Sequence, residues 1–332
     1  MKKALIRAIE NIWYKDLIIG TWLMPLGFLF SDIVRLRTWL YRSGLKKVHT
    51  LPVPVIIVGN ITVGGTGKTP LAIYLAGQLR AAGFRPGIIS RGYRGQAQAP
   101  QFVRPDSPVA EVGDEAVLMA QRAACPVVVS PQRVAAAQYL LAHSDCNVII
   151  SDDGLQHYAL GRTIEIAVVD GERRFGNGYC LPAGPLREPI NRLQSVDFIV
   201  VNGDKAEPNE FAMQLKGDSA VNLVTGEQRP LSAFSGSPCH ALAAIGNPER
   251  FFKQLASAGL VCKNHRFPDH YAYQSDDIRY ADAYPVLMTE KDAVKCTAIA
   301  TSQHWFVPVQ AEPEAEFALQ LLSLLQSQRH DR

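Results

Sequence analysis

The sequence predicts an α/β protein with a doubly wound, mainly parallel sheet, a second and smaller α/β domain, and an N-terminal helix at a membrane surface. Three observations support this prediction. Strand and helix patterns alternate along the chain from residue 53, as in parallel sheets covered by helices. One of the strands leads into a glycine-rich loop. The first 50 residues also differ from the rest in charge and hydrophobicity.

The charge of the chain is unevenly distributed. The 332 residues have a net charge of +3, but residues 1–50 hold nine Lys and Arg against three acids, which gives +6 there and −3 in the remainder. A basic segment on an acidic body indicates an anionic surface as partner. The sequence implies no nucleic acid and no protein partner. We expect a membrane-associating segment over 1–50, a first domain over 51–225 and a smaller one over 226–332.

An uncharged apolar run occupies residues 17–30. Its fourteen residues are fewer than the roughly 20 that a spanning helix needs, and no cleavage site of a signal peptide follows it. Aromatic residues typical of membrane interfaces accompany the run: Trp13, Tyr14, Trp22, Trp39 and Tyr41. We therefore expect a monotopic helix with its apolar face in the acyl boundary and its Lys and Arg on anionic head groups. A helix packed on the protein's own core is the alternative.

A strand over 53–58, a glycine-rich loop and a helix over 71–82 follow in this order. They are the parts of a phosphate-binding P-loop, and they place the first domain among P-loop NTPase-like folds. Backbone N–H groups of the loop can surround a polyphosphate, Lys68 can reach the β- and γ-phosphates of ATP, and the Thr69 hydroxyl can bind Mg²⁺. A glycine-rich hairpin is the less favoured alternative. The predicted nucleotide-binding residues are Thr62, Val63, Gly64, Gly65, Thr66, Gly67, Lys68 and Thr69.

Further strands and helices are expected along both domains. In the first domain we expect strands at 86–90, 126–130, 147–151, 164–170 and 196–201, and helices at 112–124 and 132–142. In the second we expect strands at 240–245, 286–288 and 305–309, and helices at 248–258 and 312–328. Ligands of such sheets bind beyond the carboxyl ends of the strands, so the polar residues that follow the strands are expected to converge there.

Asp152 and Asp153 end an apolar strand downstream of the P-loop. Carboxylates in this position hold Mg²⁺ in nucleotide-binding proteins, and two adjacent acids repel each other unless a cation is present. A solvated Asp-Asp-Gly turn is the alternative. Glu115 is a third candidate ligand of Mg²⁺. Candidate contacts to substrate or phosphate are Arg91, Arg133, His157, Arg187 and Glu188.

The residue pattern alone favours a structural role for Asp114 and for His270. Asp114 stands where a helix is expected to begin, and Asp is a preferred N-cap. His270 lies in a Phe-Pro-Asp-His-Tyr turn, and no spacing connects it to Asp114. The six cysteines contain no Cys-x-x-Cys pair, so we expect reduced, mostly buried thiols and no zinc site.

The ordered set of motifs resembles the tetraacyldisaccharide 4′-kinase family along essentially the whole chain. The matching segments are 59–70, 90–93, 112–115, 152–157, 186–189, 267–271 and 289–292, and a P-loop that begins with Thr62 is also the family's pattern. The resemblance implies transfer of the γ-phosphoryl of ATP to the 4′-hydroxyl of a tetraacylated glucosamine disaccharide 1-phosphate. The product would be lipid IVA, in lipid A biosynthesis. It further implies an acylated lipid substrate, a place on the cytoplasmic face of the inner membrane, and a base unit made of Asp114 and His270.

Two other classes of function compete with a lipid sugar kinase. A membrane-tethered P-loop GTPase or ATPase switch would share the P-loop and the basic N-terminus, but it needs a guanine-reading Asn/Thr-Lys-x-Asp. The segments 289–292 and 202–205 lack that spacing. A soluble ATP-dependent ligase would have no need of the basic, apolar first 50 residues.

Overall fold

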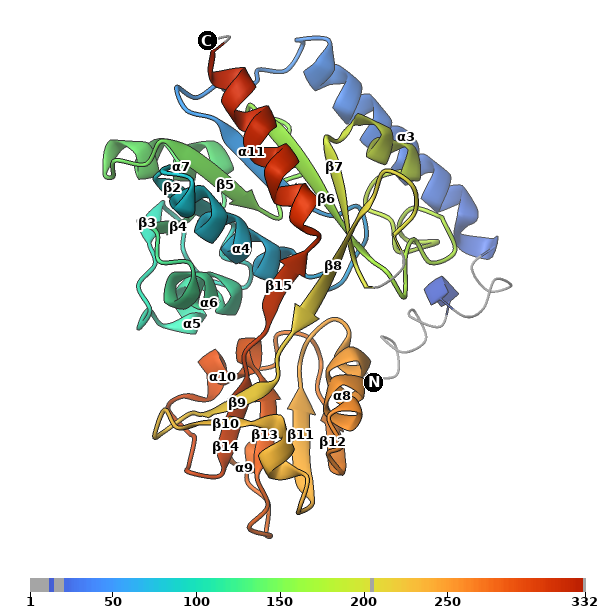
Figure 1. Cartoon of the computed structure of the whole chain (residues 1–332). Coiled ribbons are helices and arrows are strands. Elements are labelled where there is room, and N and C mark those ends of the chain that lie inside the picture. The colour runs from blue at the N-terminus through green and yellow to red at the C-terminus, as the bar shows by residue number, and fades with distance from the viewer. Residues whose placement is uncertain (1–11, 15–20, 204–205, 331–332) are drawn as a thin grey trace.

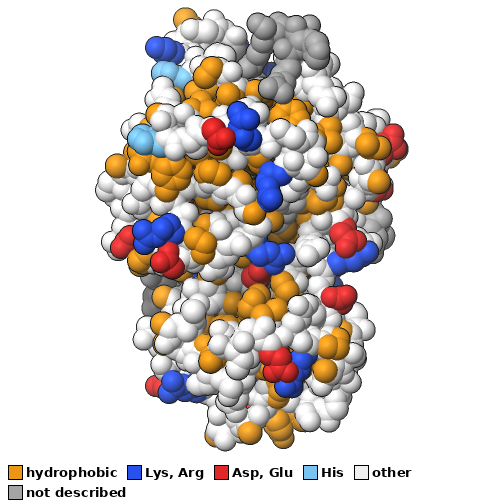
Figure 2. All heavy atoms as spheres, turned by 60° about the vertical axis from the view of Figure 1, so that its left-hand side comes forward, with side chains coloured by type: hydrophobic (Ala, Val, Ile, Leu, Met, Phe, Trp, Pro, Cys, Tyr) orange, Lys and Arg blue, Asp and Glu red, His pale blue; other side chains and the backbone are white. Residues whose placement is uncertain are grey.

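The computed structural model describes residues 12–14, 21–203 and 206–330. Two lobes lie one above the other in Figure 1, each built on its own sheet. The large lobe holds a nine-stranded sheet and the small lobe a six-stranded sheet. Figure 2 shows the waist between them, where Lys and Arg side chains lie beside Asp and Glu side chains.

The sheet of the large lobe has the order β15-β8-β7-β6-β1-β5-β2-β4-β3. All neighbours from β8 to β4 are parallel, and only the edge strands β3 and β15 pair antiparallel. This confirms the predicted α/β class with a mainly parallel sheet. The strands are β1 (Val55–Gly59), β2 (Pro86–Ser90), β3 (Gln101–Phe102), β4 (Val127–Val129), β5 (Val148–Asp152), β6 (Ile164–Asp170), β7 (Phe198–Asn202), β8 (Phe211–Lys216) and β15 (Gln310–Pro313).

Helices cover both faces of this sheet because alternate strand residues point to opposite sides. Ile56 and Val58 join one core with α4, α6 and α11, whereas Val55 and Ile57 join a second core with α7. Each strand of β1, β5 and β6 is buried along its whole length, as expected of parallel strands between two helix layers. The helices are α3 (Met24–Arg42), α4 (Lys68–Ala81), α5 (Val109–Val112), α6 (Asp114–Arg122), α7 (Arg133–Ala142) and α11 (Ala315–His330), with 3₁₀ turns η1 (Thr21–Leu23) and η2 (Ile190–Ser195).

The small lobe has the strand order β10-β9-β14-β13-β11-β12. The four strands from β14 to β12 pair parallel, and β9 and β10 pair antiparallel at one edge. Its elements are β9 (Ser219–Asn222), β10 (Gln228–Pro230), η3 (Leu231–Phe234), β11 (Cys239–Ala243), α8 (Pro248–Ser257), β12 (Cys262–Arg266), α9 (Ser275–Ile278), β13 (Val286–Thr289), α10 (Glu290–Cys296) and β14 (His304–Val307).

The chain crosses between the two lobes twice, along β8 to β9 and along β14 to β15. The expected domain boundary at residue 225 remains a prediction. Two segments belong to the sheet of the other lobe from the one that this boundary would give them. Strand β9 precedes residue 225 but belongs to the small sheet. After β14 the chain returns to the large lobe, where β15 pairs with β8 and α11 packs into the core of the large sheet.

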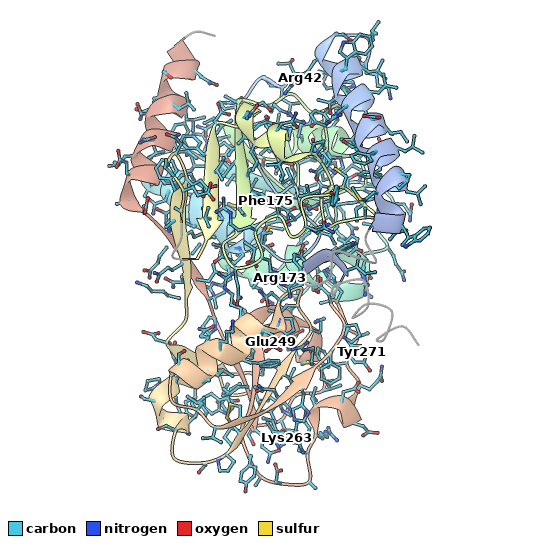
Figure 3. The ribbon with its side chains drawn as sticks, turned by 90° about the vertical axis from the view of Figure 1, so that its right-hand side faces the viewer. Arg42, Arg173, Phe175, Glu249, Lys263 and Tyr271 are labelled. Carbon is cyan, nitrogen blue, oxygen red and sulfur yellow. A yellow bond between two sulfur atoms is a disulfide. The ribbon has the colours of Figure 1, made fainter. Side chains whose placement is uncertain are left out.

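Helix α3 lies along the outside of the large lobe (Figures 1 and 3). Only Gly27 and Ser31 of the helix are buried, and a Cβ on Gly27 would meet the Cβ of Ala183 at 2.9 Å. No helix among the described residues is long and apolar enough to cross a membrane. Part of the predicted apolar run, residues 17–20, lies outside the described residues. Large apolar side chains exposed on the helix and just before it are Trp22, Leu26, Phe28, Leu29, Ile33, Leu36 and Trp39.

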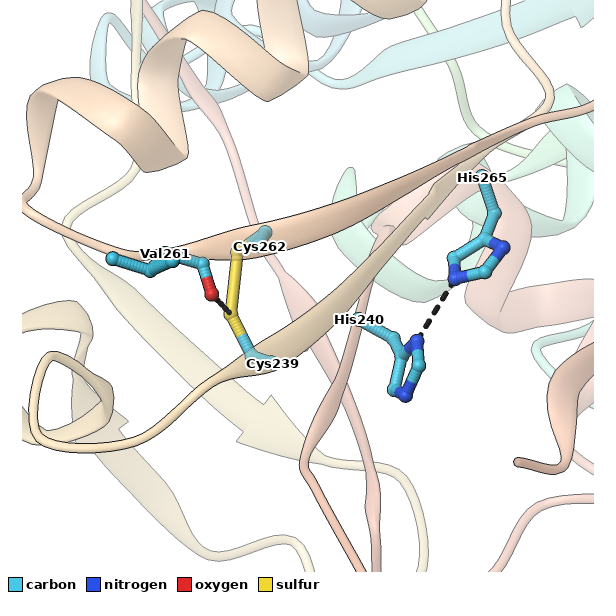
Figure 4. Close-up of a disulfide and its surroundings, with 5 residues drawn as sticks. All are labelled: Cys239, His240, Val261, Cys262 and His265. Carbon is cyan, nitrogen blue, oxygen red and sulfur yellow. Dashed lines mark hydrogen bonds between the residues drawn. A yellow bond between two sulfur atoms is a disulfide. The ribbon is translucent and has the colours of Figure 1, made fainter. Parts of the chain in front are cut away.

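A disulfide joins Cys239 and Cys262, which face each other on the neighbouring strands β11 and β12 (Figure 4). The expectation that all cysteines are reduced is therefore wrong for this pair. Sequence reasoning missed the pairing because β12 was not predicted: its residues Cys-Lys-Asn-His-Arg are mostly polar and partly exposed. The other cysteines, Cys125, Cys146, Cys180 and Cys296, are free.

Candidate active site

A cavity of about 420 Å³ lies between the lobes. The large lobe contributes the P-loop from Gly65 to Thr69 and Glu115 at the start of α6, and the small lobe contributes Gly246 and Lys291. The P-loop follows β1 and Glu115 follows the loop after β2, so this is the carboxyl edge of the parallel sheet, where ligands of such sheets bind. The side chain of Arg173, labelled at the waist in Figure 3, donates to the Gly246 carbonyl across the lobes at 2.9 Å.

The P-loop has the backbone that its glycines allow. Gly64 and Gly67 adopt φ values of +116° and +96°, which side-chain-bearing residues rarely adopt. A Cβ on Gly67 would also lie 2.6 Å from the amide nitrogen of Asn202, which donates to the Thr66 carbonyl at 2.9 Å. Helix α4 begins at Lys68 rather than at the expected residue 71, so its N-terminus points its free N–H groups at the loop.

The start of the predicted loop is held by the segment at 185–187. The Val63 N–H donates to the Pro185 carbonyl at 2.8 Å, and the Arg187 Nε donates to the Thr62 carbonyl at 3.1 Å. Thr62 is buried. Thr62 and Val63 do not line the cavity. The loop residues that do are Gly65, Thr66, Gly67, Lys68 and Thr69.

Asp152 and Asp153 have different environments although they are adjacent. Asp153 pairs with Lys68 at 3.5 Å and with Arg187 at 2.9 Å. Burial opposes the charge of Asp153, but these two cations outweigh it and lower its pKa. Asp152 is 1% exposed, and its Oδ1 has no hydrogen-bond partner among the described residues. Burial, together with the charge of Glu115, raises the pKa of Asp152 to about 7.

A buried carboxylate oxygen without a partner, acted on by the charge of a second carboxylate, fits a divalent cation because such acids are costly to bury together. Asp152, with its unpaired Oδ1 and the charge of Glu115 acting on it, meets this description. Both Asp153 and Glu115 already pair with cations, Asp153 with Lys68 and Arg187 and Glu115 with Lys291. Within the described part of the chain, no three His, Cys, Asp or Glu side chains stand close enough together to hold a metal ion.

The raised pKa of Asp152 predicts a pH-dependent stability. A carboxyl whose pKa is higher in the folded chain, about 7 here against 3.8, binds its proton more tightly when folded. The free energy of unfolding therefore falls as the pH rises between these two values. We expect denaturant titrations at pH 5 and pH 7.5 to show a loss on the order of a few kcal/mol, and Mg²⁺ to reduce it.

The Asp152→Asn protein should lose this slope, since the carboxyl with the raised pKa is gone. Asp106→Asn, a change of an exposed acid, is the matched control and should keep it. A slope that persists in Asp152→Asn would show that other groups produce it.

Asp114 and His270 meet across the two lobes. Asp114 is the first residue of α6 in the large lobe, and His270 follows β12 in the small lobe. The ring Nδ1 of His270 lies 3.0 and 2.9 Å from the two carboxylate oxygens of Asp114. Gly113, not Asp114, is the N-cap of α6, so the interpretation of Asp114 as a bare cap is wrong. The pairing that the resemblance implies is present, and its catalytic role stays a prediction.

The environment keeps Asp114 ionised. Burial works against the charged form, but the hydrogen bond of His270 and the charges of Lys291 and Lys295 outweigh burial and lower the pKa of Asp114. An ionised carboxylate only accepts hydrogen bonds, so Nδ1 of His270 carries a proton and donates it. The second ring nitrogen, Nε2, lies 3.3 Å from the Lys291 ammonium and 3.6 Å from the Asp269 carboxylate. The ring also contacts that of Tyr93 in a tilted arrangement, with centroids 5.0 Å apart.

Sequence reasoning missed Lys291. Its ammonium lies 2.9 Å from Glu115, 3.4 Å from Asp269 and 3.3 Å from Nε2 of His270. The motif at 289–292 was part of the resemblance, but the sequence assigned no role to its lysine. Only the packing of α10 against α6 brings this residue to the site, and no local pattern shows that contact.

The remaining candidates divide into exposed and buried groups. Arg91 is exposed, and its charge acts on both Arg133 and His157. Arg133 is 3% exposed and donates to the Asp152 carbonyl at 3.0 Å. Burial first, and then the charge of Arg133, lowers the pKa of His157 to about 4, which leaves it neutral near pH 7. Arg187 bridges Asp153 and the P-loop.

Glu188 is not among the residues that line the cavity, and its predicted contact with substrate stays a prediction. It is 2% exposed and accepts from the Gln156 amide at 2.7 Å and from the Tyr158 hydroxyl. Arg192 completes its surroundings at 3.5 Å. A buried carboxylate with three such partners holds the loop at 153–160 in place.

Comparison with known proteins decides the family. The model of the tetraacyldisaccharide-1-P 4′-kinase family matches residues 19–326. The chain belongs to this family. Its relatives include the tetraacyldisaccharide 4′-kinases of Nitrosococcus oceani, 56% identical over 96% of this chain and 94% of the relative, and of Methylobacillus flagellatus, 49% identical over 98% of both chains.

A solved structure of the tetraacyldisaccharide 4′-kinase family has the same fold. The crystal structure of the "apo" form of LpxK from Aquifex aeolicus in complex with ATP superposes with a TM-score of 0.79 at 30% identity. The match covers 93% of this chain and 99% of that one. The likeness confirms the predicted P-loop NTPase-like fold.

Proposed function

We propose that this chain is an ATP-dependent tetraacyldisaccharide 4′-kinase. It transfers the γ-phosphoryl of ATP to the 4′-hydroxyl of a tetraacylated glucosamine disaccharide 1-phosphate, which gives lipid IVA in lipid A biosynthesis. The observation that carries this proposal is the pairing of Asp114 with His270 beside a cavity lined by the P-loop. A phosphate-binding loop and a carboxylate–imidazole base at one cavity suit phosphoryl transfer to a hydroxyl.

The roles of the residues follow from their geometry. The loop N–H groups, the N-terminus of α4 and Lys68 bind and orient the phosphates. His270 takes the proton of the acceptor hydroxyl at Nε2, while Asp114 fixes the ring tautomer and stabilises the charge that forms on it. Thr69, Asp152 and Glu115 are the side chains that would hold Mg²⁺. When bound, the ion supplies positive charge against the β- and γ-phosphates.

In this proposal the substrate reaches the site from a membrane surface, and the composition of α3 supports it. Its exposed apolar side chains fit the acyl boundary, and basic residues such as Arg35, Arg37 and Arg42 on the same helix fit anionic head groups. The charge of Arg37 also acts on His157 beside the site. An acylated disaccharide whose chains stay in the bilayer next to α3 would present its sugar to the cavity. We place the chain on the cytoplasmic face of the inner membrane, where ATP is available.

Charges on the apolar face of α3 should weaken membrane binding. The protein with Leu29→Glu and Leu36→Glu is expected to lose most of its co-sedimentation with vesicles that contain phosphatidylglycerol. Each leucine side chain that enters the bilayer contributes about 2 kcal/mol to the free energy of membrane binding. Leu319→Glu on α11 is the matched control, since Leu319 is 68% exposed against 57% and 56% for the other two. Equal loss in the control, or none in the double variant, would contradict the assignment of α3 to the membrane.

The decisive experiment for the proposed function is phosphate transfer from γ-labelled ATP to the disaccharide lipid in detergent micelles. We expect label at the 4′ position and no reaction when the 4′-hydroxyl is absent. A membrane-tethered GTPase or ATPase switch would instead hydrolyse nucleotide without labelling the lipid. That alternative is not favoured, because the guanine-reading spacing is missing from the sequence.

A further inference from the structure

Lys291 blocks the nitrogen that the proposed reaction needs as a base. Its ammonium lies 3.3 Å from Nε2 of His270, and an ammonium is only a donor. Nδ1 donates to Asp114, and Nε2 lies between the Lys291 ammonium and the Asp269 carboxylate, whose Oδ2 is 3.6 Å away. A ring that acts as a base must be neutral, and its Nε2 then accepts from Lys291, so that lone pair cannot take the proton of an acceptor hydroxyl. The base therefore works only after the Lys291 ammonium has moved away.

The same ammonium also neutralises a carboxylate of the candidate cation site. Lys291 lies 2.9 Å from Glu115 of the large lobe and 3.4 Å from Asp269 of the small lobe. Its side chain is 16% exposed. Burial disfavours the charge of Lys291, but Glu115, Asp269 and Asp114 outweigh burial and raise its pKa. Lys291 thus remains an ammonium, and it contacts both Glu115 and Nε2 of His270 at the same time.

A nucleotide in the cavity would offer Lys291 a further partner. Lys291 lines the same cavity as Lys68 and the glycine-rich loop, and the phosphates of a nucleotide held by that loop carry several negative charges. Arg122 and Arg250 also line this cavity, but their contacts, with Glu290 at 2.6 Å and with the Asn202 carbonyl at 2.7 Å, do not involve the base or Glu115.

Lys291 is also well placed to move between these partners. It is the second residue of α10, which lies in the small lobe and packs on α6 of the large lobe. Its long, unbranched side chain can turn from one acceptor to another without a change in the backbone. The three acceptors that it contacts come from both lobes, so the ammonium sits at the boundary where nucleotide and acceptor would meet.

We propose that Lys291 is a positioning residue that masks Nε2 of His270 and transfers its charge to the terminal phosphate of ATP, so that nucleotide binding exposes the base and releases Glu115. This inference rests on the proposed function for the identity of the base. It predicts that Lys291 distinguishes ATP from ADP, because only ATP carries a γ-phosphate. It also predicts that the state of the His270 ring responds to nucleotide through Lys291.

The test uses the full chain in detergent micelles, as wild type, Lys291→Met and Lys291→Arg. Calorimetric titration with a non-hydrolysable ATP analogue and with ADP gives the first reading. We expect Lys291→Met to weaken binding of the ATP analogue on the order of 10- to 100-fold, as for the loss of one charge-assisted hydrogen bond. Binding of ADP should change less than about 3-fold, and Lys291→Arg should restore most of the affinity for the analogue.

Nitrogen NMR of histidine-labelled protein gives the second reading, with the His270 signal assigned from its absence in His270→Gln. In the wild type we expect the ATP analogue, but not ADP, to shift the Nε2 resonance as the ammonium leaves. In Lys291→Met the resonance should already differ before nucleotide is added and should respond little to it. Lys263→Met, a change of an exposed lysine on the same lobe, should behave as the wild type in both readings.

Equal weakening for the ATP analogue and ADP would overturn the proposal, as would an Nε2 resonance that responds to the analogue in Lys291→Met as it does in the wild type. Neither reading requires turnover. If the wild type transfers no phosphate to the disaccharide, the proposed function fails, while the binding and NMR results still decide the role of Lys291.

Discussion

Lys68→Ala is expected to lower kcat on the order of 10³-fold or more, and Thr69→Ala nearly as much. Phosphoryl transfer depends on positioning and on positive charge at the γ-phosphate, and Lys68 is the P-loop cation that faces Asp153 across the cavity edge. Thr69 is 8% exposed in the first turn of α4, where we propose that its hydroxyl binds Mg²⁺. Steady-state kinetics at saturating ATP and lipid measure both losses.

The controls for this prediction concern folding. Asp153 keeps its contact with Arg187 at 2.9 Å when Lys68 is removed, so the melting temperature of Lys68→Ala should change little. Thr69→Ser keeps the hydroxyl and should retain most of the activity. A kcat near that of the wild type in Lys68→Ala or Thr69→Ala, with a normal melting curve, would refute the assignment of the P-loop.

Asp114→Ala and His270→Ala are each expected to lower kcat by about 10²- to 10⁴-fold, the usual range for acid–base catalysis. The double variant should lose little more than the worse single variant, because groups that act as one unit are not additive. KM for ATP should change little, since neither residue lines the cavity. The measurement is a double-mutant cycle on kcat.

Two controls separate catalysis from stability in this cycle. Asp114→Asn keeps the shape and hydrogen-bonding capacity of the side chain but not its charge, so its melting temperature should stay closer to that of the wild type than in Asp114→Ala. His143→Ala removes a histidine that lies at the end of α7 and should leave kcat unchanged. Fully additive losses, or losses that follow the melting temperatures alone, would refute a base unit.

The fold of the large lobe could be predicted because its strands are buried along their whole length. The strands at 86–90 and 164–170 were predicted with the observed bounds, since short apolar segments bounded by turn residues favour buried strands. The missed strands are short or half exposed. Strand β8 alternates partly buried and exposed residues, and β12 is mainly polar. Such strands exist because a neighbouring strand pairs with them, which no local pattern records.

Local sequence patterns also predicted only part of the candidate site. The P-loop and the two aspartates were predicted because their chemistry is local: each motif is continuous in sequence and follows a strand. The pairing of Asp114 with His270 joins residues 156 positions apart, and only the family resemblance implied it. Lys291 could not be assigned because its contacts with Glu115 and His270 depend on how the two lobes meet.

The return of β15 and α11 to the large lobe sets the order in which this chain can fold during synthesis. The nucleotide-binding loop is complete by residue 69, yet Phe317, Leu321 and Leu325 of α11 belong to the same core as Ile56 of β1. Until the ribosome has released these residues, one face of the sheet lacks its last helix and β8 remains an open edge. The nascent chain therefore contains the whole P-loop sequence before the large lobe that supports it can complete its core. A chain that ends after β14 would lack β15 and α11 and would expose the core of this lobe.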